Sequence, residues 1–365
     1  MSALMEMMDA ASSDPLREAR QYAASGGRVI GLVGADVPFE LIAATGAMAV
    51  ALPAFADEPT PHADRYLEPS FSPYLRSIIE QWLQGRLDFM ATVIFTRGDD
   101  SAQRAYYYLC ELQRRHQARG PVPLIFDIAK IPSAASMAHT REAARILAQE
   151  TSSDPARLPQ AIAARDRRRS LFARLERLRR SAQAPSGSQC ERILRLADSV
   201  TAERFDRALT EWLDGGFPGQ QGPRVLLAGT TPPDGRLHQA VERAGGSIVA
   251  EFEDAGNDRL GPIIAGAADP IAALADHYHS LAHGPRSFGG RAARLATRAA
   301  GCAVDAVIWW LIEEDEVGAW QTPAATAALA AARIPMLSLT RRAWHARDGA
   351  PEQIEAFTRK LRTIA

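Results

Sequence analysis

Short apolar runs recur along the chain and predict the strands of parallel sheets. Four lie within the first 130 residues and four after residue 220, at about 28–33, 48–52, 90–95, 123–127, 224–228, 247–252, 305–312 and 335–339. Most are continuous rather than alternating, which is typical of strands covered by helices on both faces. Helical periodicity and capping residues fill the stretches between the runs. The pattern therefore predicts two strand–helix regions.

The middle of the chain has a different pattern, with no strand predicted from about residue 134 to 215. Apolar residues recur there at helical spacing, as at Leu171, Leu175 and Leu178. We predict an α/β protein with two Rossmann-like parallel-sheet domains and an intervening helical segment. The expected parts are an N-terminal α/β domain, a helical connecting segment and a C-terminal α/β domain, at 1–133, 134–221 and 222–365. The 365 residues suit two domains.

Arginines are dense between residues 165 and 180. One interpretation is a patch that binds phosphate or a coenzyme. The other is a solvent-facing helix surface with local ion pairs such as Glu176–Arg180. Interleaved acidic and apolar residues favour the second interpretation.

The scattered histidines show no spacing that favours a metal site. His277 and His279 are two residues apart on a predicted helix, and we expect surface or capping roles for them. No convincing partner for His238 is evident from spacing.

Composition excludes some classes of partner. The formal net charge is −1, so no global field attracts nucleic acid or an anionic membrane. The first ten residues lack the basic and apolar regions of a secretory signal, and no apolar run approaches the roughly 20 residues that span a bilayer. Three widely spaced cysteines, Cys110, Cys190 and Cys302, show no metal-type spacing and suit a reducing compartment. We expect a cytoplasmic protein without nucleic-acid or membrane partners.

Carboxylates follow two of the predicted strands. Asp99 and Asp100 come after the run at 90–95, and Glu313 and Glu314 come after the run at 305–312. Ligands of open α/β sheets bind beyond the carboxyl ends of the strands, which makes these positions candidates for a site. The alternative is a pair of solvated loops at the strand ends, with Asp100 capping the following helix. The glycine-rich dinucleotide and P-loop motifs are absent from the sequence.

A predicted helix begins at Ser72-Pro73, where serine suits the N-cap and proline the first turn. Arg76 lies one turn further along and could meet a phosphate or carboxylate group, or form a surface ion pair. Arg104, in the helix after Asp100, is also expected to face the ligand.

Several segments together resemble the 2-hydroxyacyl-CoA dehydratase and benzoyl-CoA reductase subunit family, from about residue 28 to 361. They include VPFELIAATGA, YLEPSFSPYLRS, DFMATVIFTRGDDSAQRAYYYL, RVLLAG, GGSIVAEFEDAGNDR, VDAVIWWLIEED and ARIPMLSLTRRAW. The resemblance implies two similar α/β domains joined by helices and pairing with a homologous subunit. It also implies an acyl-CoA substrate, a [4Fe-4S] cluster held by three cysteines, and dehydration (a lyase reaction) or reduction driven by an activator ATPase.

This sequence departs from the family pattern at the cluster ligands. The three cysteine positions correspond to Ser72, to Asp99 (Gly98 if the alignment shifts by one) and to about Ile312. Iron–sulfur clusters require thiolate ligands almost without exception. We therefore expect no [4Fe-4S] cluster in this chain.

The favoured hypothesis is a divergent subunit that binds an acyl-CoA or related ligand in a cleft between its domains, beside a homologous partner in a homo- or heterodimer. One alternative is an enzyme of non-radical chemistry, with carboxylates that bind Mg²⁺ or Mn²⁺ in the former cluster cavity. Another is a binding or regulatory module without catalysis. No catalytic residue is assigned; the candidate ligand-facing residues are Ser72, Arg76, Asp99, Asp100, Arg104 and Glu313.

Overall fold

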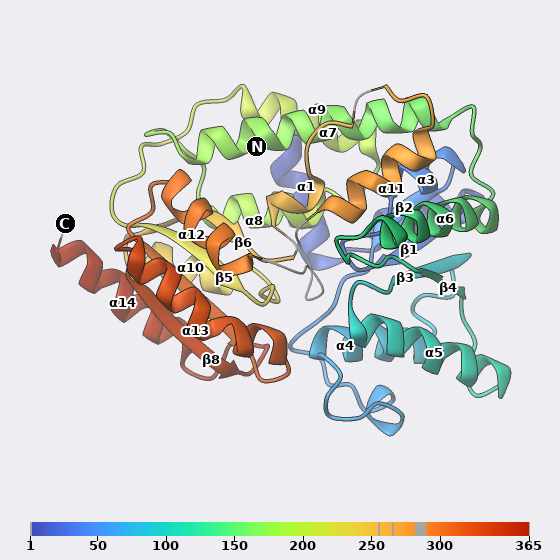
Figure 1. The fold of residues 1–365 in the computed structure, drawn as a ribbon, viewed down its shortest axis with the longest axis horizontal. Coiled ribbons are helices and arrows are strands. Elements are labelled where there is room, and N and C mark those ends of the chain that lie inside the picture. The colour runs from blue at the N-terminus through green and yellow to red at the C-terminus, as the bar shows by residue number, and fades with distance from the viewer. Residues whose placement is uncertain (1, 255, 265, 282–289, 365) are drawn as a thin grey trace. The chain divides into compact units, whose positions relative to one another are not determined.

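The computed structural model describes residues 2–254, 256–264, 266–281 and 290–364. They divide into two compact units, each assembled from three stretches of chain (Figure 1). Unit 1 takes the described residues of 2–171, 196–212 and 259–281, and unit 2 those of 172–195, 213–258 and 290–364. The helical middle of the sequence thus contributes to both units.

Unit 1 is built on a parallel sheet. Its strands are β1 (Val29–Val33), β2 (Met48–Ala51), β3 (Thr92–Thr96) and β4 (Val122–Phe126), in the spatial order β2-β1-β3-β4. Leu32 of β1 pairs with Ala51 on one side and Ile94 on the other. After β1 the chain continues to β2 at one edge of the sheet, and after β3 it continues to β4 at the other edge. The strand order therefore reverses between β1 and β3, which is the usual place for a ligand site. The four strands lie where the apolar runs predict them.

Helices cover both faces of this sheet, as continuous apolar strands require. One core packs around Trp82 and Phe95, and the other around Ile94 and Tyr278. The first core includes residues of α2 (Arg17–Ala24), α4 (Pro73–Leu83) and α5 (Asp100–Arg114), and the second those of α3 (Phe39–Ala44), α6 (Ala134–Thr151) and α11 (Pro270–Ser280). The unit also contains α1 (Ala3–Ser13), the 3₁₀ turn η1 (Ala63–Arg65) and α9 (Ala202–Leu213, whose last residue falls in unit 2). The 3₁₀ turn η2 (Asn257–Leu260) begins in unit 2 and ends in unit 1.

Unit 2 repeats the sheet plan. Its parallel strands are β5 (Arg224–Gly229), β6 (Ser247–Phe252), β7 (Ala306–Ile312) and β8 (Met336–Arg342), in the order β6-β5-β7-β8. Its helices are α8 (Gly187–Leu196), α10 (Arg236–Arg243), α12 (Arg291–Gly301), α13 (Glu316–Ala331) and α14 (Ala350–Ile364). Leu295 of α12 and Leu329 of α13 pack with Trp309 of β7. The two parallel sheets confirm the predicted α/β fold.

Helix α13 begins earlier than the sequence predicts. The sequence pattern predicts a helix at about Thr322 to Ala332, but α13 runs from Glu316 to Ala331 and contains Pro323. Asp315 sets the true start, since its carboxylate accepts a hydrogen bond from the amide of Gly318 at 2.8 Å. The acidic cap therefore marks the first turn of the helix, although a proline inside a helix is unfavourable.

The longest described helix, α7 (Leu158–Arg179), crosses from unit 1 to unit 2 between residues 171 and 172. As predicted, no strand element falls between β4 and β5 in the described chain. Within the described ranges, we find no helix with the combination of length and apolar character needed to cross a membrane.

Candidate functional site

The carboxyl edge of the unit 1 sheet contains a buried ion pair. Lys130, after β4, donates to Asp36, after β1, with 2.5 Å between Nζ and Oδ1. The side chains are 3% and 4% exposed, and Lys130 also donates to the backbone oxygen of Leu281 at 3.1 Å. Because a buried charge is stable only when it is paired and hydrogen-bonded, these contacts fix the loops after β1 and β4 together.

Gly98, in the loop after β3, lies against the same pair. A Cβ atom at this position would lie 2.2 Å from Oδ2 of Asp36, far inside contact distance. The Gly98 amide donates to Oγ1 of Thr96 at 3.0 Å, which holds the turn. Glycine is therefore required here for the close approach of backbone to carboxylate.

Three half-exposed side chains, those of Arg97, Asp127 and His139, interact at the same edge of the sheet. Arg97 donates to Asp127 at 2.6 Å, and Nε2 of His139 lies 3.2 Å from the other carboxylate oxygen. The hydrogen bond to Asp127 raises the pKa of Arg97. An imidazole oriented by a carboxylate can transfer protons, so the trio offers chemistry that the sequence analysis did not assign.

Ser72 and Arg76 belong to the start of α4. Oγ of Ser72 accepts a hydrogen bond from the Leu75 amide at 3.4 Å, so this residue is the N-cap. Arg76 lies 2.5 Å from Asp64 and donates to the backbone oxygens of Leu67 and Glu68. Both residues shape the loop before α4.

Asp99, Asp100 and Arg104 belong to the start of α5. Asp99 is the N-cap and accepts a hydrogen bond from the Ala102 amide at 3.0 Å, while Asp100 is exposed in the first turn. Arg104 donates to Glu68 at 3.0 Å, and its guanidinium lies 4.0 Å from the ring centroid of Phe71.

Glu68 is the residue on which the two predicted arginines meet, and the sequence analysis did not single it out. Its carboxylate receives Arg104 and the hydroxyl of Tyr108, and its backbone oxygen receives Arg76. The hydrogen bond from Tyr108, followed by the contact with Arg104, lowers the pKa of Glu68. Its position in YLEPSFSP, just before the helix predicted from Ser72, was the available signal. Unit 1 thus brings Arg76 and Arg104 together at Glu68. Ser72 lies between Glu68 and Arg76 in the sequence.

Glu313 belongs to unit 2, directly after β7. It forms an exposed ion pair with Arg341 of β8 at 2.7 Å, and this hydrogen bond lowers its pKa. At the same edge, Oγ1 of Thr230 donates to Asp315 at 2.6 Å. The other five predicted residues lie in unit 1, so a common site for all six stays a prediction.

The arginines of α7 form only part of the solvated face that the sequence pattern favours, because Arg167 and Arg177 are exposed but others are not. Four of them are buried, each against a carboxylate: Arg165 with Asp198, Arg168 with Asp206, Arg169 with Glu40 and Arg179 with Glu251. The side chain of Glu176 lies 2.7 Å from Arg298 of α12, and Arg180 donates to the backbone oxygen of Glu176 at 3.2 Å. The prediction was wrong for these four arginines, because the carboxylates that neutralise them are distant in sequence.

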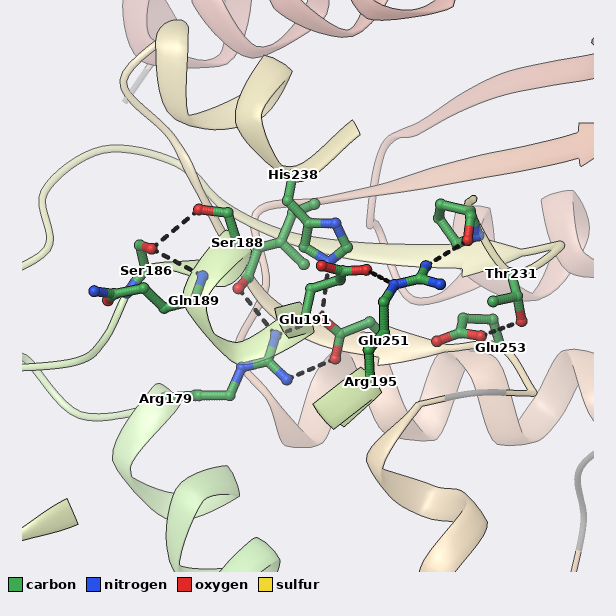
Figure 2. A network of polar contacts seen from close by, with 12 residues as sticks. Arg179, Ser186, Ser188, Gln189, Glu191, Arg195, Thr231, His238, Glu251 and Glu253 are labelled. Atoms are coloured by element: carbon green, nitrogen blue, oxygen red, sulfur yellow. Dashed lines mark hydrogen bonds and ion pairs between the residues drawn. The ribbon is translucent and has the colours of Figure 1, made fainter. Parts of the chain in front are cut away.

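Figure 2 shows the buried network of unit 2 around Glu251 of β6. Both guanidinium NH₂ groups of Arg179 donate to its carboxylate at 2.6 Å, and Nε2 of His238 lies 3.1 Å away. Burial raises the pKa of Glu251, but the charges and hydrogen bonds of Arg179 and His238 outweigh burial and leave the pKa well below its usual value. His238 therefore has a partner that spacing did not reveal.

The other two histidines are also buried, contrary to the predicted surface or capping roles. Nε2 of His277 lies 3.1 Å from the Leu260 oxygen, and Nδ1 of His279 lies 2.9 Å from Oγ1 of Thr140. Both side chains pack inside unit 1, where α11 meets α6 and α7.

The thiols are a poor match for a [4Fe-4S] cluster. Cys110 lies in unit 1, whereas Cys190 and Cys302 are buried in unit 2. Burial raises the pKa of all three thiols, that of Cys190 to about 12, which disfavours the thiolate that binds iron. Among the residues described, no group of three or more histidine, cysteine, aspartate or glutamate side chains is arranged to hold a metal ion.

Comparison with known families accounts for nearly the whole chain. The profile of the family described as 2-hydroxyglutaryl-CoA dehydratase, D-component, matches residues 35–361. No curated protein matches the chain significantly. The family match agrees with the two parallel α/β units and with the order of the sequence segments, and the chain therefore belongs to the 2-hydroxyglutaryl-CoA dehydratase D-component family.

Proposed function

We propose that this chain is a subunit of a 2-hydroxyacyl-CoA dehydratase-type complex that holds no [4Fe-4S] cluster of its own. A homologous chain paired with it carries the cluster. The observation that carries the proposal is the set of residues at the three positions that the family resemblance assigns to cluster cysteines. Ser72 and Asp99 cap helices, and Ile312 is a buried strand residue. None of the three side chains supplies a thiolate.

Iron analysis tests this proposal directly. The chain, purified alone under anaerobic conditions, is expected to contain no stoichiometric iron or acid-labile sulfide. Co-expression with a homologous chain that has all three cysteines is expected to yield a complex with iron in the partner. Stoichiometric iron in the chain alone contradicts the proposal, and the variant Cys110→Ser then tests whether the most exposed thiol takes part.

The proposed ligand is an acyl-CoA or a related molecule bound at the carboxyl edges of the sheets. Arg76 and Arg104 support this, because both cations meet at Glu68, where a ligand phosphate or carboxylate could replace the contact with Arg104. A hydrogen bond to a charged group contributes about 1.5–3 kcal/mol, a factor of roughly 10–150 in affinity. Arg104→Ala is therefore expected to weaken binding of a 2-hydroxyacyl-CoA by at least that lower factor, measured by titration calorimetry. Arg115→Ala, near the other end of α5, is the matched control and should leave affinity unchanged.

A carboxylate site for Mg²⁺ or Mn²⁺ is the second hypothesis, and the local contacts do not favour it. Asp99 is engaged as a helix cap and Glu313 in an ion pair with Arg341. Addition of either cation is expected to leave the melting temperature unchanged. A rise that Asp99→Ala abolishes would instead support the metal site.

A further inference from the structure

Helix α13 turns an apolar face to solvent. Trp320 is 86% exposed and Val317 is 41% exposed, although both are large apolar side chains. On the opposite side of the same helix, Ala325 and Leu329 are buried against the sheet of unit 2. Figure 1 shows α13 beside α12, which it contacts along the same layer. The inner side of α13 therefore accounts for its packing within unit 2, and the outer side does not contribute to that packing.

The outer side of α13 also lacks the charges that a solvated helix surface carries. No charged residue occurs from Val317 to Ala332. Trp320 is followed on the same exposed side by Ala324, Ala327 and Ala331, at spacings of four, three and four. Surface helices normally place polar and charged residues opposite the core, so an exposed apolar face marks an interaction surface.

Charges flank this face and have opposite signs at its two ends. Glu316 is exposed in the first turn, and Arg333 is exposed just after the last turn. Two copies of α13 packed antiparallel place each Glu316 opposite the Arg333 of the other copy. A parallel pair instead places like charges together. The charge pattern is therefore complementary to itself under a two-fold axis.

The sizes of the exposed side chains also favour an antiparallel orientation of the two α13 helices. Val317 and Trp320 lie in the first half of α13, and the exposed alanines dominate the second half. In an antiparallel pair, the indole of Trp320 packs on Ala327 and Ala331 of the other copy, where small side chains leave room. Exposed tryptophans that pack into such positions commonly dominate the energy of an interface.

We propose that two copies of this chain associate through antiparallel packing of their α13 helices. The inference goes beyond the proposed function, because that function pairs this chain with a homologous chain, whereas the contact here joins two copies of the same chain. A helix of 16 residues is about 24 Å long, which gives an interface at the small end of the specific range. The dimer is therefore expected to dissociate on dilution.

Sedimentation velocity of the full chain over a series of concentrations tests the proposal. The wild type is expected to shift from monomer to dimer as concentration rises. Trp320→Glu is expected to weaken dimerisation by at least roughly tenfold, while its melting temperature stays unchanged because the side chain is exposed. Tyr107→Glu, at an exposed aromatic residue of unit 1, is the matched control and should dimerise like the wild type.

A charge exchange tests the antiparallel arrangement. Glu316→Arg and Arg333→Glu should each weaken the dimer alone, and an equal mixture of the two variants should restore it. A monomeric wild type, an unaffected Trp320→Glu variant or a mixture without recovery would overturn the proposal. Binding of a homologous chain to this face, without self-association, would also overturn it. Iron in a chain that still dimerises contradicts the proposed function alone, so the two failures are distinguishable.

Discussion

The two units share one sheet plan but place their buried charges differently. In unit 1, the ion pair of Asp36 and Lys130 lies at the carboxyl edge, against Gly98. In unit 2, the buried Arg179–Glu251 pair includes a residue within β6, and the carboxyl edge has the hydroxyl–carboxylate contact of Thr230 with Asp315. The comparison teaches that strand order fixes where a site can lie, while the loop residues decide its chemistry.

Helix α7 supplies buried guanidinium groups to both units. Arg169 pairs with Glu40 in unit 1, and Arg179 pairs with Glu251 in unit 2. Buried ion pairs add little net stability, but loss of one partner leaves an uncompensated charge. We infer that these pairs fix the position of α7 within each unit rather than increase stability.

The largest expected effect is the loss of the ion pair in unit 2. Arg179→Ala leaves Glu251 buried without its bidentate partner, so we expect the free energy of unfolding to fall by about 3–5 kcal/mol. Chemical denaturation monitored by tryptophan fluorescence measures it. Arg177→Ala, on the exposed side of the same helix, should change stability by less than about 0.5 kcal/mol. Equal effects of the two substitutions would contradict the distinction between buried and exposed arginines.

A smaller effect is expected at the carboxyl edge of unit 1. Gly98→Ala places a methyl group against Oδ2 of Asp36, and overpacking of this kind costs about 1–3 kcal/mol. Thermal and chemical denaturation measure the loss. Gly216→Ala, at an exposed site with no atom near the added Cβ, should be neutral or slightly stabilising. A neutral Gly98→Ala variant would show that the loop after β3 does not need this close approach.

The predicted site residues should differ in their effects on stability. Asp99→Ala removes a helix cap in unit 1 and should cost about 1 kcal/mol. Glu313→Ala removes an exposed ion pair in unit 2, and no measurable change in unfolding is expected. Differential scanning calorimetry of the two variants compares them. A larger loss for Glu313→Ala would indicate a structural role that its exposure does not suggest.

The smallest effect on the free energy of unfolding at neutral pH is expected from the buried histidines of unit 1. This effect grows as the pH falls. Burial is the main cause that lowers the pKa of His277 and His279 below the usual 6.5. The unfolded chain therefore binds these protons first, and stability falls as the pH drops from 6.5 through the lower folded values. In unit 2, the lowered pKa of Glu251 has an effect only below its usual value of 4.5.

Denaturant unfolding at several pH values tests this difference between the units. His277→Gln should flatten the pH dependence of the free energy of unfolding below pH 6.5. An unchanged slope in His277→Gln would show that this imidazole is protonated equally in the folded and unfolded states.

The fold could be predicted from sequence because the strands are continuous apolar runs with short connections. Capping chemistry is also local, so Ser72 could be recognised as a candidate cap as well as a candidate ligand. The cap expected at Asp100 was wrong by one residue, because Asp99 is the N-cap of α5. The buried contacts could not be predicted in this way. Lys130 and Asp36 are separated by 94 residues, and Arg169 and Glu40 by 129, so no local pattern links them. Glu68 was overlooked because its partners lie on two separate helices.

The central claim is that helix-capping residues and a buried strand residue occupy the three positions at which related chains are expected to have iron-binding cysteines. Anaerobic reconstitution of the isolated chain with iron and sulfide, followed by electron paramagnetic resonance of the reduced sample, tests it most directly. The account predicts no cluster signal and no stoichiometric iron after desalting. A stable [4Fe-4S] signal at one cluster per chain would contradict it.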